Sequence, residues 1–171
     1  MRPVWGRLDA HRRDWGVAMD NRAAASDPKH YVHAGSGERF PGHVAFLDVV
    51  QDPGSSLGAL AVPVDAARLD ALDAREVNYD RHDVTAGFAG ADGERLGPVV
   101  WVYRGTGAGR ERARRGAAAG DLVVSRGYVR DVARAFDAQP DALPAFGAST
   151  VPPGCPSLDL DLVARPELLG Y

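Results

Sequence analysis

Alternating or mostly apolar runs predict strands in the first third of the chain. Leu8–Arg22 alternates around Trp15, and His43–Val50 is a second, more continuously apolar run. The latter leads into Asp52-Pro53-Gly54-Ser55, which favours a turn because Pro fixes φ and Gly tolerates the left-handed region. We therefore predict that His43–Val50 and Leu57–Val62 form a hairpin.

Two later apolar runs also predict strands. Val99–Tyr103 is β-branched and aromatic, the composition of a buried strand. Leu158–Val163 alternates again and is expected to close the sheet. By contrast, Asp27–Gly42 and Gly87–Gly97 are rich in Gly and polar residues, so both are predicted to be loops.

Helical patterns occupy the remaining segments. Asp65 is a good N-cap for a helix over Ala66–Ala74, because its carboxylate can accept a bond from a free backbone N–H of the first turn. Leu69 and Leu72 share one face of that helix. The other predicted helices are Glu111–Ala119, Ser125–Ala138 and a short one from Asp141 to near Gly147.

The pattern changes sharply after Ala74. From Val77 onward apolar or aromatic residues alternate with polar ones, which predicts that a strand begins there. Glu76 is therefore expected at the corner between a helix and a strand. A glutamate at such a place is either a solvated acid paired with Arg75 or Arg81, or a functional carboxylate.

Composition narrows the class of protein. A chain of 171 residues with 45% hydrophobic and 25% charged residues predicts one folded domain over residues 1–171. The net charge of −3 gives no basic surface for nucleic acid. Cys155 is the only cysteine, so an internal disulfide is excluded and the reducing cytoplasm is the expected location. No secretory segment or membrane-length apolar run appears, so export and membrane spanning are not expected.

One short run carries a family resemblance. Leu72-Asp73-Ala74-Arg75-Glu76, followed by Tyr79 and Arg81, resembles the signature of the γ-glutamylcyclotransferase family. The family's later strand bearing a Tyr is matched by Val99–Tyr103, and its helix-opening Ser-x-x-Tyr by Ser125–Tyr128. The resemblance spans roughly Trp15 to Arg165, and the order of its pieces makes it more specific than any one of them.

The resemblance implies a fold and an activity. The expected fold is α+β, a small mixed barrel-like sheet flanked by helices. The expected reaction cyclises the γ-glutamyl group of an amide or peptide to 5-oxoproline and releases an amine. It implies a small γ-glutamyl substrate as partner and needs no cofactor or metal.

The resemblance also assigns site residues. Glu76 would be the catalytic acid/base, and Tyr128 would contact the substrate. Tyr79, Arg81 and Tyr103 are further candidates for substrate binding. Because one carboxyl group would accept a proton and return it, we expect Glu76 to point into a water-poor cavity.

Two departures from the family pattern affect these expectations. Val77 stands where the family usually has Gly, and no Tyr-Gly-Ser, the family's substrate-holding turn, occurs in the chain. We expect the domain to lack the N-terminal strand and loop, which would leave an open sheet edge and favour poor stability or a homo-oligomer. The alternative to an enzyme is a non-catalytic binding or interaction protein that keeps the fold.

Other groups of residues suggest weaker hypotheses about phosphate or metal binding. Gly105–Arg110 resembles a phosphate-binding loop but has Arg110 where the dinucleotide fingerprint needs its last Gly. His30 and His33, with His43, could suggest a metal, but a loop position favours surface histidines. Solvated side chains are predicted for the basic helix face and for two acids near the C-terminus: Arg110, Arg112, Arg114, Arg115, Asp159 and Asp161.

Overall fold

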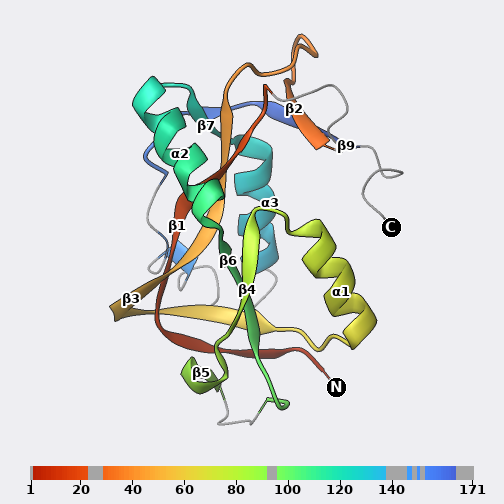
Figure 1. Ribbon diagram of the computed structural model, residues 1–171, viewed down its shortest axis with the longest axis vertical. Helices are drawn as coiled ribbons and strands as arrows, with labels where there is room; N and C mark the ends of the chain where they lie inside the picture. The colour runs from red at the N-terminus through yellow and green to blue at the C-terminus, as the bar shows by residue number, and fades with distance from the viewer. Residues whose placement is uncertain are drawn as a thin grey trace.

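The computed structural model describes residues 2–22, 29–91, 96–137, 146–147, 150 and 153–164 (Figure 1). Within these residues, no helix combines the length and apolar character that crossing a bilayer requires. The elements, in chain order, are β1 (Val4–Asp20), β2 (Lys29–His33), β3 (His43–Ala61), α1 (Ala66–Arg75), β4 (Tyr79–Asp83), a 3-10 turn (Thr85–Gly87), β5 (Phe88–Gly90), β6 (Trp101–Gly105), α2 (Gly107–Ala119), β7 (Leu122–Ser125), α3 (Arg126–Asp137), β8 (Ser157–Leu158) and β9 (Leu160–Ala164).

The strands form three sheets. The largest has the order β5-β1-β3-β7-β8, in which β1 and β3 are antiparallel and β7 is parallel to β3. Two separate ribbons pair β2 with β9 and β4 with β6. The predicted α+β class is confirmed, but the barrel-like arrangement is not, because the strands of the described segments do not close into one sheet.

The predicted hairpin is wrong. β3 is one continuous strand whose two halves both pair with β1, with Asp9 opposite Ser56 and His11 opposite Gln51. The four residues Asp52–Ser55 therefore sit in an irregularity of the ladder, where Ala10 of β1 adopts a φ of 57°. Pro and Gly bend the strand here instead of reversing it. Figure 1 shows β1 and β3 turning together to run across one end of the molecule.

The predicted loop over Asp27–Gly42 contains a strand. β2 pairs with β9, with Tyr31 opposite Leu162. The alternation predicted for Leu158–Val163 is divided between β8, which joins the edge of the large sheet, and β9, which does not. Sequence periodicity does not reveal β2, because this strand is short and polar and its partner lies more than 120 residues away in the sequence.

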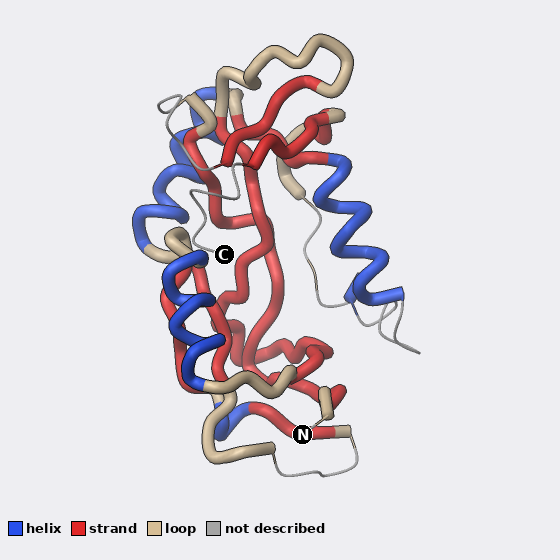
Figure 2. Tube along the Cα trace, turned by 90° about the vertical axis from the view of Figure 1, so that its right-hand side faces the viewer, coloured by secondary structure: helices blue, strands red, loops and turns tan. Residues whose placement is uncertain are grey.

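The helices lie on two sides of the strands (Figure 2). The prediction of α1 is confirmed, and Asp65 Oδ1 accepts a hydrogen bond from Arg68 N at 2.8 Å. The predicted positions of α2 and α3 are confirmed within a few residues. The helix predicted from Asp141 falls largely outside the described residues.

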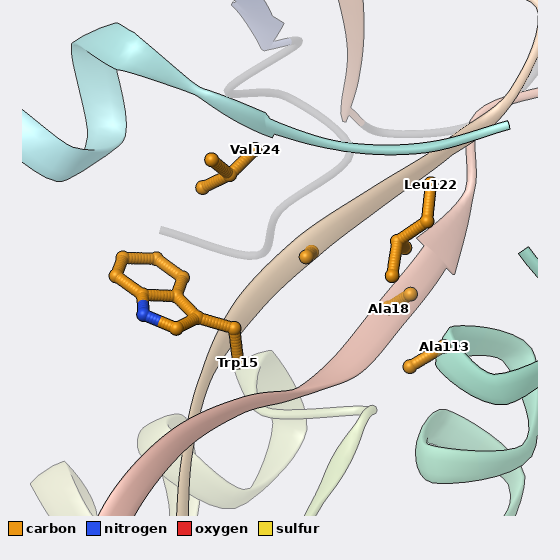
Figure 3. Packing of buried hydrophobic residues seen from close by; sticks show 6 residues of the cluster. Trp15, Ala18, Ala113, Leu122 and Val124 are labelled. Carbon is orange, nitrogen blue, oxygen red and sulfur yellow. The ribbon is translucent and has the colours of Figure 1, made fainter. Parts of the chain in front are cut away.

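The core forms where α2 meets the large sheet. Trp15, Ala18, Ala113, Leu122 and Val124 surround one another in Figure 3, with Ala45 completing the cluster. α2 contributes small residues to this contact, since its buried positions are Gly109, Ala113 and Gly116. A methyl group on Gly116 would lie 2.9 Å from the side chain of His43. Small side chains at helical spacing therefore let α2 approach the strands closely.

Candidate functional site

Glu76 ends α1. Its backbone N–H donates to Leu72 O at 2.9 Å, and its carbonyl accepts from Tyr79 N at 2.8 Å, so the chain turns directly from helix to strand. The expected corner is confirmed. The side chain is 24% exposed, and its Oε1 accepts a bond from Arg75 Nε at 2.8 Å. Glu76 is therefore sheltered on part of its surface and held by an ion pair, rather than enclosed in the dry cavity that we expected.

The substitution of Val for Gly after Glu76 causes no backbone strain. Within the described segments, the only residue other than Gly with a positive φ is Ala10. Val77 is 71% exposed, so its side chain points into solvent and imposes no packing demand. The corner therefore does not need the left-handed conformation that favours Gly.

The corner is fixed by α2. Asn78 O accepts from Thr106 N at 2.9 Å, and Asn78 Oδ1 accepts from Arg112 Nη2 at 2.5 Å. Arg112 Nε also donates to Ala18 O at 2.8 Å, so this one guanidinium joins the corner to β1. The position of Glu76, two residues from Asn78, is thereby set by contacts with distant segments.

Two phenols share the backbone of Leu47. Tyr79 donates its hydroxyl to Leu47 O at 2.7 Å, and Tyr128 receives a hydrogen bond from the Leu47 backbone. Burial raises the pKa of both tyrosines, and the charge of Glu76 raises the pKa of each further. The carboxylate therefore lies close enough to influence both hydroxyl groups.

The bond from Tyr79 to Leu47 gives a testable stability prediction. Tyr79→Phe removes the donor and leaves a carbonyl oxygen without that partner. We expect the melting temperature to fall by roughly 2–5 °C. Thermal unfolding followed by circular dichroism measures this, and an unchanged melting temperature would show that the bond contributes nothing.

Tyr103 and Arg81 form the outer side of the site. They are opposite each other across β4 and β6, and both bind Asp73 of α1: Tyr103 donates to Oδ1 at 2.6 Å, and Arg81 Nη1 lies 3.1 Å from Oδ2. The guanidinium also stacks 4.8 Å from the ring of Trp101. Desolvation first, and then the bond to Asp73, raises the pKa of Tyr103 to about 12, and the charge of Glu76 adds to this. Both side chains are engaged with the protein.

The Ser-x-x-Tyr segment positions its tyrosine. Ser125 is buried, and its hydroxyl donates to Leu160 O at 2.9 Å. The same oxygen lies 3.4 Å from Tyr128 N at the start of α3. Ser125 thus anchors the first turn of the helix, and Tyr128 projects from that turn toward Phe46, with ring centroids 5.3 Å apart.

Asp48 is the buried charge that the sequence analysis missed. It is 1% exposed, and its two oxygens accept from Gly105 N and Arg110 Nε, each at 2.7 Å. A single acid inside the apolar run of β3 was the available signal, since charged residues are rarely buried without a partner. This ion pair ties the start of α2 to β3, and the charge of Asp48 also raises the pKa of Tyr79.

Asp14 lies directly opposite Asp48 across the two strands. Burial raises the pKa of Asp14, and the charge of Asp48 raises it further, while Arg12 and the N–H of Gly16 oppose the change. A carboxyl group with a raised folded-state pKa destabilises the fold above that pKa, and this cost disappears as pH falls below the unfolded value near 3.9.

The raised pKa of Asp14 leads to a pH-dependent prediction for the stability of the Asp14→Asn variant. The stability of the variant relative to the parent protein should be more favourable at pH 7 than at pH 3, because only the ionised carboxylate carries the cost. Melting temperatures of both proteins from pH 3 to pH 7 provide the comparison. A difference that does not change with pH would contradict the linkage.

The glycine loop before α2 already uses several of its N–H groups within the protein. Gly105 N donates to Asp48, and Gly109 N donates to the N-cap side chain of Thr106 at 3.0 Å. A carboxylate, that of Asp48, thus already accepts the N–H at the start of the loop, and the helix cap uses another. The structure therefore favours the simpler interpretation, a loop that starts a helix.

The histidines also differ from expectation. His30 and His33 lie on β2, not in a loop, and His43 is buried at the start of β3. His43 Nδ1 lies 2.7 Å from Asp121 Oδ1, and its Nε2 accepts from Arg22 Nη2 at 3.1 Å. Within the described segments, no three His, Cys, Asp or Glu residues are grouped as metal ligands.

The basic face of α2 is only partly solvated. Arg110 and Arg112 make the inward contacts described above, which corrects the prediction for these two residues. Arg114 is 72% exposed and pairs with Glu111. Near the C-terminus, Asp161 is exposed, while the exposed Asp159 pairs with Arg126 at 2.5 Å.

The predicted site residues differ in how they relate to Glu76. Tyr79, Tyr103 and Tyr128 all lie within electrostatic range of Glu76, whereas Arg81 is directed to Asp73. Comparisons with protein-family models, curated proteins and solved structures found no match to this chain.

Proposed function

We propose that the protein is a γ-glutamylcyclotransferase-like enzyme of the cytoplasm, with Glu76 as its general acid and base. The observation that carries the proposal is the position of this carboxylate. It is 24% exposed at the corner between α1 and β4, and its charge contributes to the raised pKa of Tyr79, Tyr103 and Tyr128. The motif that resembles the family thus coincides with a partly sheltered acid among hydrogen-bonding side chains.

The substrate supplies its own nucleophile in this reaction. As a carboxylate, Glu76 takes one proton from the α-ammonium group, and the resulting amine attacks the γ-carbonyl carbon. The new C–N bond closes a five-membered ring, and Glu76 returns its proton to the departing nitrogen as the original C–N bond breaks. The ring nitrogen loses a second proton to water, and the released amine gains one. No oxidant or cofactor enters this balance.

The protein's main task is to fold the flexible glutamyl group so that its two ends meet. Such positioning turns the attack into a reaction of high effective concentration. The rings of Tyr128 and Phe46, whose centroids lie 5.3 Å apart, offer an apolar surface on which the aliphatic part of the substrate can rest. Tyr128 is also the residue that the resemblance assigns to substrate contact.

A product assay tests the proposal. The purified protein is incubated with γ-glutamyl amides and γ-glutamyl peptides, and the products are identified by mass spectrometry. Formation of 5-oxoproline and free amine in equal amounts is expected. Release of glutamate instead of 5-oxoproline would indicate hydrolysis and contradict the proposed mechanism.

The same assay addresses the second candidate, a non-catalytic binding protein. The absence of Tyr-Gly-Ser from the sequence and the pairing of Glu76 with Arg75 favour this candidate. If none of the γ-glutamyl compounds is converted, yet one of them raises the melting temperature in proportion to its concentration, the binding function is supported.

A further inference from the structure

The turn that begins at Glu76 has little packing of its own. Glu76 O accepts a hydrogen bond from Tyr79 N at 2.8 Å, so residues 76–79 form a tight turn between α1 and β4. None of the ten described residues of α1 is buried, and Val77 within the turn is 71% exposed. Because hydrophobic burial does not fix this turn, its position depends on polar contacts.

Asn78 joins the turn to α2 through both of its oxygen atoms. Its carbonyl accepts from the N–H of Thr106, the N-cap of α2, at 2.9 Å. A Cβ atom on Gly109 would lie 3.2 Å from this carbonyl oxygen, so the small residue lets the turn approach the helix closely. The side-chain oxygen of Asn78 accepts from Arg112 Nη2 at 2.5 Å. The turn is therefore clamped against the first two turns of α2.

Arg112 is anchored in the core through its second hydrogen bond. Its Nε donates to Ala18 O at 2.8 Å. Ala18 is fully buried and belongs to the same core cluster as Ala113, the next residue on α2. One planar guanidinium thus connects a fixed strand to the turn. A lysine cannot reproduce this connection, because its donors share one nitrogen atom.

We propose that Arg112 is a positioning residue, which holds the turn in the orientation that presents the Glu76 carboxylate to the substrate. This role rests on the proposed function. Proton transfer requires the two heavy atoms to meet within hydrogen-bond distance, and a displacement of about 1 Å can slow a reaction about 100-fold. Since Arg112 acts through Asn78 and not on the reacting atoms, its loss should lower kcat more than it changes KM.

The test is a double-mutant cycle on the reaction rate with a γ-glutamyl amide as substrate, at a temperature where circular dichroism shows every variant to be folded. Arg112→Ala and Asn78→Ala are each expected to lower kcat by about 10- to 100-fold and to change KM by less than about 3-fold. Both changes break the same hydrogen bond, so the double variant should be at most about 3-fold slower than the slower single variant. Arg112→Lys should also lose kcat, because an ammonium group cannot serve both acceptors.

Hydrogen exchange reports on the turn without the reaction. The Tyr79 amide, which donates to Glu76 O, should exchange at least about 3-fold faster in Arg112→Ala than in the parent protein. Arg114→Ala removes a guanidinium that is 72% exposed on the same helix, and it should leave both this exchange rate and kcat nearly unchanged.

A packing variant separates positioning from a general loss of stability. Val44→Ala removes buried core volume and should lower the melting temperature while the folded protein keeps the parent kcat. The role of Arg112 is overturned, while the proposed function stands, if Arg112→Ala keeps the parent kcat, if the two single losses multiply in the double variant, or if Val44→Ala slows the reaction equally. If the parent protein makes no 5-oxoproline, the proposed function itself fails, and this role fails with it.

Discussion

Formation of 5-oxoproline by the Glu76→Gln variant is expected to be about 100- to 10,000-fold slower than by the parent protein, the usual loss when a general acid or base is removed. The amide of Gln keeps the size and polarity of the side chain but cannot carry a proton between the two nitrogens. Because Glu76 is 24% exposed and its side chain bonds only to Arg75 in the described structure, the variant should still fold. Initial rates at several substrate concentrations measure the effect as a loss in kcat.

The matched control is Glu111→Gln on α2. Glu111 is a glutamate whose side chain is 46% exposed and pairs with Arg114, so the same chemical change is made at a carboxylate that the mechanism does not use. Its rate is expected to equal that of the parent protein. A Glu76→Gln variant that also keeps the parent rate would remove the basis for assigning the acid/base role to this residue.

Unfolding of the Asp48→Ala variant should require about 3 kcal/mol less free energy than unfolding of the parent protein. The change removes a fully buried carboxylate and leaves the guanidinium of Arg110 and the N–H of Gly105 without their acceptor. Arg110 is 33% exposed and can partly turn to water, which keeps the loss at the lower end for a broken buried ion pair. The melting temperature should fall by roughly 6–12 °C.

A double-mutant cycle with Arg110→Ala separates the pair from its surroundings. The double variant should be more stable than the sum of the two single losses predicts, since the second change removes a charge that the first left unpaired. Asp70→Ala, at an exposed position on α1, should change stability by less than about 0.5 kcal/mol. Additive losses in the cycle would mean that Asp48 and Arg110 do not stabilise each other.

The helices could be predicted from the sequence because their signals are local. Asp65 stands immediately before α1 and caps it, and the apolar spacing of α3 lies within its own twelve residues. The bend in β3 could not be predicted in the same way. Asp52-Pro53-Gly54-Ser55 suits a reversal as well as a bulge, and the choice is made by β1, which pairs with the residues on both sides.

The candidate site shows the same contrast between local signals, which the sequence reveals, and long-range contacts, which it does not. The helix-to-strand corner at Glu76 follows from the change of period in the sequence, and the structure has it there. The contacts that hold it come from Arg112 and Thr106, about 30 residues later, and α2 packs through small residues that carry no hydrophobic signal. Arg110 and Arg112 looked like solvated charges because periodicity does not reveal which distant acceptor a guanidinium meets.

The two phenols that bond to Leu47 have a consequence for solubility. β7 pairs with β3 only over His43–Ala45, so Leu47 lies just past the last paired residue. Its carbonyl oxygen is already occupied by Tyr79, and its backbone also serves Tyr128. A strand from another molecule that paired with β3 at Leu47 would have to replace the hydrogen bonds that Tyr79 and Tyr128 make there. The two tyrosines, which belong to the proposed catalytic centre, therefore also protect this unpaired edge of β3 from amyloid-like pairing with another chain.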